Sequence, residues 1–181
     1  MQKYFKELII RILLCFVPIS VFSLIFTPLT IYGSYFISKL FFNITLNGNV
    51  LFVNGFPFRI IEACVASAAY YFLWLLCFLT KDIKWAVRGK IIIYGFGLIF
   101  LMNISRIWLL IFIAMNFGFR WFNVVHLAFW NFVTGVYVAF VWIFLVWHFK
   151  IIDIPIYSDI KHIYRMGFRK SRRPAKPKYP L

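Results

Sequence analysis

Apolar residues form four long runs along this chain, and short polar stretches separate each run from the next. A helix needs about 20 predominantly apolar residues to cross the hydrocarbon core of a bilayer. The four runs reach roughly this length, and they cover residues 8–32, 61–80, 91–115 and 124–149. The pattern predicts an all-α membrane protein with a bundle of four transmembrane helices.

One segment, before the second run, has the two-residue period of a strand. From Ile44 to Phe52, apolar side chains recur at every second position on both sides of the pair Asn47-Gly48. Asn-Gly between alternating runs favours a type I′ turn. Residues 43–53 are therefore predicted to form a short extracytoplasmic β-hairpin.

The composition supports a membrane protein and excludes other classes. Of 181 residues, 64% are hydrophobic, 23% are aromatic and only 14% are charged, which is too apolar for a soluble or a disordered chain. The first run is also too long for a typical cleaved signal peptide and lacks a convincing cleavage site. The three cysteines, Cys15, Cys64 and Cys77, have no spacing that indicates a disulfide framework or a metal site.

The net charge of +15 comes from residues that flank the apolar runs. Three Lys and Arg lie at the N-terminus (Lys3, Lys6 and Arg11), four lie between the second and third runs, and nine lie in the tail, whereas Lys39, Arg59 and Arg120 would lie on the opposite side. This bias predicts that both termini are cytoplasmic. Residues 1–149 would form the membrane domain, and residues 150–181 a basic, disordered cytoplasmic tail. Orientation and anionic headgroups account for the basic residues, so no nucleic-acid partner is expected.

Three chemically distinctive side chains are predicted at one depth, near the outer face of the membrane. At about 1.5 Å per residue, Arg106 would lie about 22 Å and Cys64 about 24 Å from the inner boundary. His126 would open the fourth span at the outer boundary. Because ionisable groups within a span are costly, their default interpretation is functional.

Such a set suits acyl transfer. A neighbouring imidazole or cation converts a thiol into the nucleophilic thiolate. A guanidinium stabilises the oxyanion that forms on an attacked carbonyl. Glu62 lies close to the cysteine in sequence, and Asn103 shares a helix face with Arg106, so both are candidates to orient these groups.

Structural alternatives remain open for each of these residues. A cysteine in an apolar helix is commonly a small packing residue, which is how we interpret Cys15 and Cys77. His148 and His162 are interpreted as interfacial. Arg106 could pair with Glu62 or with backbone carbonyls and serve only helix packing.

The motifs that contain these residues resemble those of the archaeosortase and exosortase family of membrane transpeptidases. They are Glu62-Ala63-Cys64 after the hairpin, Asn103-Ile104-Ser105-Arg106 in the next span, and His126 at the start of the last span. The resemblance implies that Cys64, Arg106 and His126 are catalytic, that no cofactor or metal is needed, and that the active site faces outward in the cell membrane. It further implies cleavage of C-terminal sorting tails from exported surface proteins, with transfer of the acyl group to an acceptor such as a membrane lipid.

The chain also departs from that family. Val65-Ala66 follows the cysteine where many members have Ser-Gly, and the additional spans of larger members are missing, as in minimal archaeal members. Two other functions stay open: a non-enzymatic transporter subunit or assembly partner, and a membrane thiol acyltransferase. The substrate, the acceptor, the general base and the oligomeric state are not fixed by the sequence.

Overall fold

The structure is a computed structural model that describes residues 2–81, 83–129 and 134–151. These residues are mostly helical, as predicted. The helices are α1 (Gln2–Cys15), α2 (Ile19–Lys39), α3 (Glu62–Val65), α4 (Ser67–Leu79), α5 (Trp85–Phe117), α6 (Phe119–Ala128) and α7 (Thr134–His148). The strands are β1 (Ile44–Asn47), β2 (Val50–Val53) and β3 (Phe56–Arg59).

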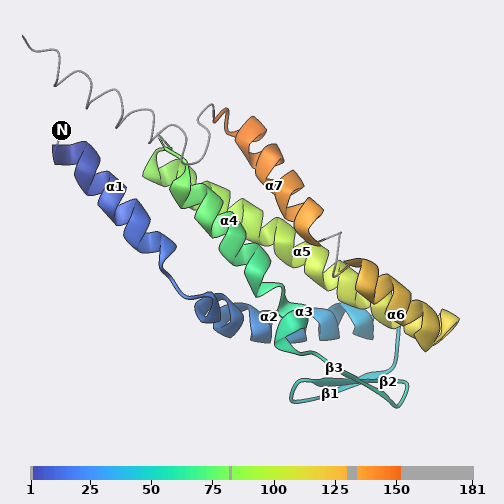
Figure 1. The fold of residues 1–181 in the computed structure, drawn as a ribbon. Coiled ribbons are helices and arrows are strands. Elements are labelled where there is room, and N and C mark those ends of the chain that lie inside the picture. Colours follow the sequence, from blue (N-terminus) through green and yellow to red (C-terminus); the bar gives the residue numbers. More distant parts are fainter. Residues whose placement is uncertain (1, 82, 130–133, 152–181) are drawn as a thin grey trace, which may run out of the picture.

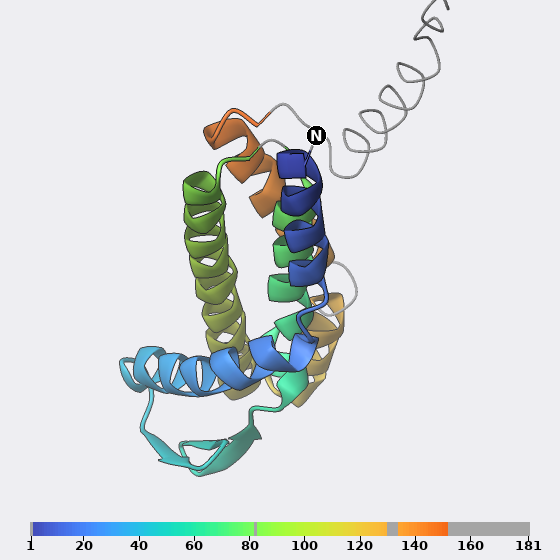
Figure 2. The same cartoon turned by 90° about the vertical axis from the view of Figure 1, so that its left-hand side faces the viewer.

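Four helices, α1, α4, α5 and α7, run alongside one another, and α2 lies across them near one end (Figures 1 and 2). The small sheet, α3 and α6 lie at that same end of the molecule. The N-terminus, the turn between α4 and α5 and the end of α7 lie at the other end. The fold therefore has two distinct ends: one carries the sheet, and the other carries the start of α1 and the end of α7.

Two helices in the described residues, α2 and α5, are long and apolar enough to cross a membrane by length and composition. The prediction of four continuous spans is therefore wrong. The run at 91–115 does lie within one helix, since α5 has 33 residues. The other three runs are each divided between two elements.

A proline divides the first run. Helix α1 ends at Cys15 and α2 begins at Ile19, with Pro18 in an extended conformation immediately before it. Proline lacks the N–H that a continuous helix requires, and its ring disfavours helical geometry in the preceding residue. The change of direction that follows allows α2 to lie across the bundle instead of extending α1.

Ala66 divides the second run. It adopts a left-handed conformation, with φ 59° and ψ 35°, between α3 and α4. A continuous helix would pair the carbonyls of Cys64 and Val65 with N–H groups four residues further on. Here Arg106 and Asn103 of α5 bond to these two carbonyls instead, which compensates for the interrupted helix.

The fourth run is divided between α6, which ends at Ala128, and α7, which starts at Thr134. The predicted tail, residues 150–181, lies outside the described residues except for Lys150 and Ile151.

The predicted hairpin is confirmed and belongs to a three-stranded antiparallel sheet with the order β1-β2-β3. The predicted type I′ turn at Asn47-Gly48 is wrong: Asn47 pairs with Val50, so the two-residue loop is Gly48-Asn49, and of these two residues only Gly48 has a positive φ, of 60°. The third strand was not predicted, although the pair Asn54-Gly55 precedes it with φ 48° and 86°, as a type I′ turn requires. The sheet packs against α5, where Leu51 and Val53 are fully buried beside Ile107 and Ile111.

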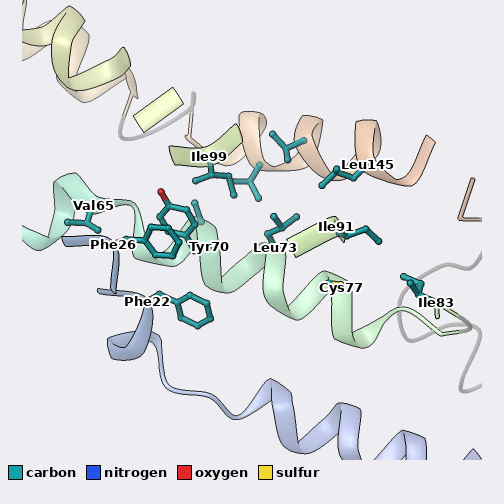
Figure 3. Close-up of a cluster of buried hydrophobic side chains, with 13 residues drawn as sticks. Phe22, Phe26, Val65, Tyr70, Leu73, Cys77, Ile83, Ile91, Ile99 and Leu145 are labelled. Carbon is teal, nitrogen blue, oxygen red and sulfur yellow. The ribbon is translucent and has the colours of Figure 1, made fainter. Parts of the chain in front are cut away.

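The main hydrophobic core lies where α2, α4, α5 and α7 meet (Figure 3). Phe26 stacks on Tyr70 with ring centroids 3.7 Å apart. Gly95 of α5 allows close packing, because a Cβ atom there would collide with Leu73 of α4 and lie 3.0 Å from Leu145 of α7.

One face of α2 carries hydroxyl groups. Thr30, Ser34 and Ser38 follow each other at four-residue intervals, are completely buried, and have no hydrogen-bond partner for Oγ among the described residues. On the same helix, Gly33 allows close approach to α5, because a Cβ atom there would collide with Ile104.

Candidate functional site

Cys64 lies on the single turn of α3, directly before the backbone break at Ala66. Its side chain is half-buried and packs against the cluster formed by the sheet and α5. Its backbone N–H bonds to the carbonyl of Ile61 at 2.8 Å. The break therefore places the cysteine at a junction of three elements, where it keeps partial access to the surroundings.

Arg106 reaches α3 from the middle of α5. Its Nη2 atom donates a hydrogen bond of 3.0 Å to the backbone carbonyl of Cys64. The guanidinium and the Cys64 side chain also lie close enough to interact electrostatically. The residue is only 6% exposed, so its charge acts in a region of low dielectric, where it has a stronger effect than in water.

Asn103, one helical turn before Arg106, supports the same break. Its Nδ2 atom donates a hydrogen bond of 3.3 Å to the carbonyl of Val65, and its buried Oδ1 atom has no partner in the described residues. Glu62 is the first residue of α3 and is exposed. Within the described part of the chain, no ion pair joins Glu62 to Arg106.

His126 lies on α6, which packs against α5. Its ring contacts Phe122 of the same helix, with centroids 5.6 Å apart. Among residues 2–81, 83–129 and 134–151, no hydrogen bond joins His126 to Cys64 or to Arg106. The structure thus joins two of the three predicted catalytic residues and leaves the imidazole without a direct link to them.

A hollow of about 520 Å³ opens beside the break. Its lining includes small residues of α3 and α4 together with Glu62, Arg106 of α5 and Gly135 of α7. Small side chains favour close helix packing, and five of them lie in this region: Ala63, Ala66, Ser67, Ala68 and Ala69. Ser67 does bring α4 near α2, through a 2.9 Å bond between its Oγ and that of Ser23, but all five also line the hollow.

No family model, curated protein or solved structure matches this chain. In the described residues, no group of three or more His, Cys, Asp and Glu side chains could hold a metal ion. The candidate site therefore consists of Cys64, Arg106 and the hollow. No local signal predicts the break at Ala66, because alanine in an apolar run normally continues a helix.

Proposed function

We propose that this chain is a membrane-embedded cysteine transpeptidase that cleaves C-terminal sorting tails from exported surface proteins. One observation carries the proposal: the 3.0 Å hydrogen bond from Arg106 to the Cys64 carbonyl, which holds a buried cation beside a half-buried thiol. The residues on both sides of this bond belong to the two motifs that resemble the archaeosortase and exosortase family. The acyl group would pass to an acceptor such as a membrane lipid.

In the proposed reaction, the Cys64 thiolate attacks the carbonyl carbon of the scissile peptide bond, and Arg106 stabilises the resulting oxyanion. His126 takes the thiol proton and returns it to the leaving amine, which departs with the tail. A nucleophile of the acceptor then attacks the thioester and releases the sulfur. The role of His126 rests on its sequence motif and requires it to approach Cys64 during the reaction.

A membrane setting is supported by the exposed apolar surface. Side chains on several helices are more than two-thirds exposed, and they include Leu24 at 79%, Ile93 at 72% and Trp147 at 76%. Water disfavours such a surface, whereas lipid tails accommodate it. We propose a multi-pass protein in which α5 and the helices alongside it cross the bilayer, and α2 and the sheet lie towards the outer face.

The charge distribution supports the orientation that we propose. Basic residues dominate at the N-terminus, between α4 and α5, and in the sequence after α7. The N-terminal end of α1, the turn between α4 and α5 and the C-terminal end of α7 share one end of the fold (Figure 2). That end would be cytoplasmic. Cys64 would then face the exported substrate from the extracytoplasmic side.

A structural role for Arg106 is the second candidate. Arg106 and Asn103 both bond to carbonyls that the break at Ala66 leaves free, and this alone would justify two buried polar residues. In that case the protein would be a non-enzymatic assembly partner, and Cys64 would be a packing residue.

The two candidates differ in what they predict for Cys64→Ala. We would co-express the chain with a co-encoded protein that carries a C-terminal hydrophobic tail, and measure the mass of that protein. The transpeptidase requires a shortened product with the wild type and with the control Cys15→Ala, and an intact protein with Cys64→Ala. Equal processing by all three variants would overturn the proposal. An intact tail together with a newly acylated lipid would instead indicate a thiol acyltransferase.

A further inference from the structure

The first turn of α4 has backbone donors for which the described residues supply no acceptor. Ala66, the residue at its N-terminal boundary, provides no side-chain cap. The Cys64 carbonyl, which would accept the Ala68 N–H in a continuous helix, accepts the Arg106 guanidinium instead. Ala69 and Tyr70 both bond to the Ala66 carbonyl, whereas the N–H groups of Ser67 and Ala68 have no backbone acceptor within the described chain. Unpaired N–H groups give a helix N-terminus its partial positive charge.

Arg106 adds a full positive charge to the same place. Although it is 94% buried (6% exposed), only one of its N–H donors has an acceptor among the described residues, and the buried Nε atom is unpaired. A buried donor without a partner costs free energy. The guanidinium therefore retains donors for a group that the described residues do not supply.

Both features face the hollow beside the break. Arg106, Ser67 and Ala68 all line its 520 Å³, a size at the lower end of what small-ligand sites have. The neighbouring alanines let a ligand approach the backbone closely. Glu62 also lines the hollow but is exposed and forms no ion pair with Arg106 in the described structure.

We propose that this hollow binds a carboxylate group, held by the free donors of Arg106 and by the Ser67 and Ala68 N–H groups. A planar carboxylate matches a guanidinium in two parallel hydrogen bonds. A single cation and the nearby Glu62 carboxylate favour a monoanion over a phosphate dianion. The proposal uses Arg106 of the proposed active site but does not depend on chemistry at Cys64. The carboxylate could belong to the end of a peptide or to a fatty acid.

Binding can be measured by calorimetry on the full chain in nanodiscs of uncharged phosphatidylcholine. The probes are acetyl-alanyl-alanine and octanoate, each compared with its amide. We expect at least one carboxylate to bind about tenfold more tightly than its amide, and the preferred probe identifies the source. Arg106→Gln should remove this preference, and Glu62→Gln should increase it. Cys64→Ala removes the proposed nucleophile but no carboxylate donor. It should therefore bind the carboxylate probes as the wild type does, whether or not the protein is a transpeptidase.

A proline pair tests the backbone donors without changing charge. Ala68→Pro removes one N–H in the first turn of α4, where proline is tolerated because that N–H has no helical acceptor. Ala86→Pro makes the same change at the same position of α5, at the other end of the fold. Ala68→Pro should weaken carboxylate binding severalfold, and Ala86→Pro should leave it unchanged. Equal binding of carboxylates and amides, or equal loss with both prolines, would overturn the proposal, even if Arg106→Gln does not fold.

Discussion

Buried arginines lie near both ends of α4, but the hydrogen bonds that they make differ between the two ends. At the C-terminal end, Arg11 donates to the carbonyls of Phe78 and Leu79, at 2.8 and 3.1 Å. Arg88 donates to the carbonyls of Cys77, Thr80 and Ile83. Near the N-terminal end, Arg106 donates to one carbonyl, that of Cys64 in α3, and the N–H groups of Ser67 and Ala68 have no backbone acceptor in the described part of the chain.

The helix dipole explains what this difference means. A cation near a helix C-terminus is stabilising because the last carbonyls carry partial negative charge, whereas a cation near the N-terminus is repelled. Arg11 and Arg88 therefore stabilise the fold. The dipole of α4 repels Arg106, which lowers the stability of the fold. Such an unfavourable interaction is typical of sites where positive charge is needed for binding or catalysis.

The largest expected effect is that of Arg88→Ala. Arg88 is 3% exposed and supplies donors to three carbonyls, so its loss leaves several buried acceptors unpaired. We expect the free energy of unfolding to fall by about 4 kcal/mol or more. Denaturation in mixed detergent micelles would measure it.

Arg106→Ala is the matched comparison. It removes one hydrogen bond to a carbonyl, which corresponds to about 2 kcal/mol, and it should abolish processing of the tailed substrate. If Arg88→Ala and Arg106→Ala lowered the free energy of unfolding equally, Arg106 would stabilise the fold as much as Arg88 does, which contradicts a binding or catalytic role.

An intermediate effect is expected where α5 packs against the middle of α4, from Gly95→Ala in α5. The new methyl group would collide with Leu73 and press against Leu145, and overpacking of this kind costs about 1–3 kcal/mol. Gly97→Ala, two residues along the same helix, has nothing within 4 Å of the added Cβ atom. The free energy of unfolding of Gly97→Ala should rise by up to about 1 kcal/mol, because alanine has a higher helix propensity than glycine. Thermal unfolding of the two variants would separate packing from propensity.

The smallest effect is expected for Ala66→Gly. Left-handed geometry costs an alanine about 1–2 kcal/mol, and the greater freedom of glycine in the unfolded chain offsets part of this gain. A net stabilisation of about 0.5–1 kcal/mol should result, again measured by thermal unfolding. Ala69→Gly, in the regular part of α4, should destabilise by about 1 kcal/mol or more. If both variants destabilise, the break at Ala66 is not strained.

Local signals predicted the elements that local chemistry determines. The alternation around Asn47-Gly48 identified the hairpin, and the run at 91–115 identified the centre of α5, because turn preference and helical hydrophobicity act over a few residues. The same reasoning could have found β3 from Asn54-Gly55. Pro18 is a local signal for a helix break within the first run, but the length of that run favoured a single helix.

The break at Ala66 could not be predicted in this way. Nothing in Val65-Ala66-Ser67 disfavours a helix strongly, and the break depends on acceptor carbonyls being paired by Arg106 and Asn103, about 40 residues away in sequence. The contact between Cys64 and Arg106 was predicted only as a shared depth. Depth in the membrane does not specify the direction in which a side chain points. His126 is therefore predicted at the same level as the thiol, but its distance from the thiol is not.

The buried hydroxyl face of α2 has a consequence for how this helix is oriented. Around Gly33, the buried side of α2 carries Thr30, Ser34 and Ser38, and Gly33 itself packs against Ile104 of α5. Turning α2 by half a turn would press Tyr32 and Phe36, which are 56% and 63% exposed, into this contact. Lipid tails are as apolar as a protein core, so they do not sort side chains by hydrophobicity. Side-chain volume, rather than polarity, then determines which way round this helix sits.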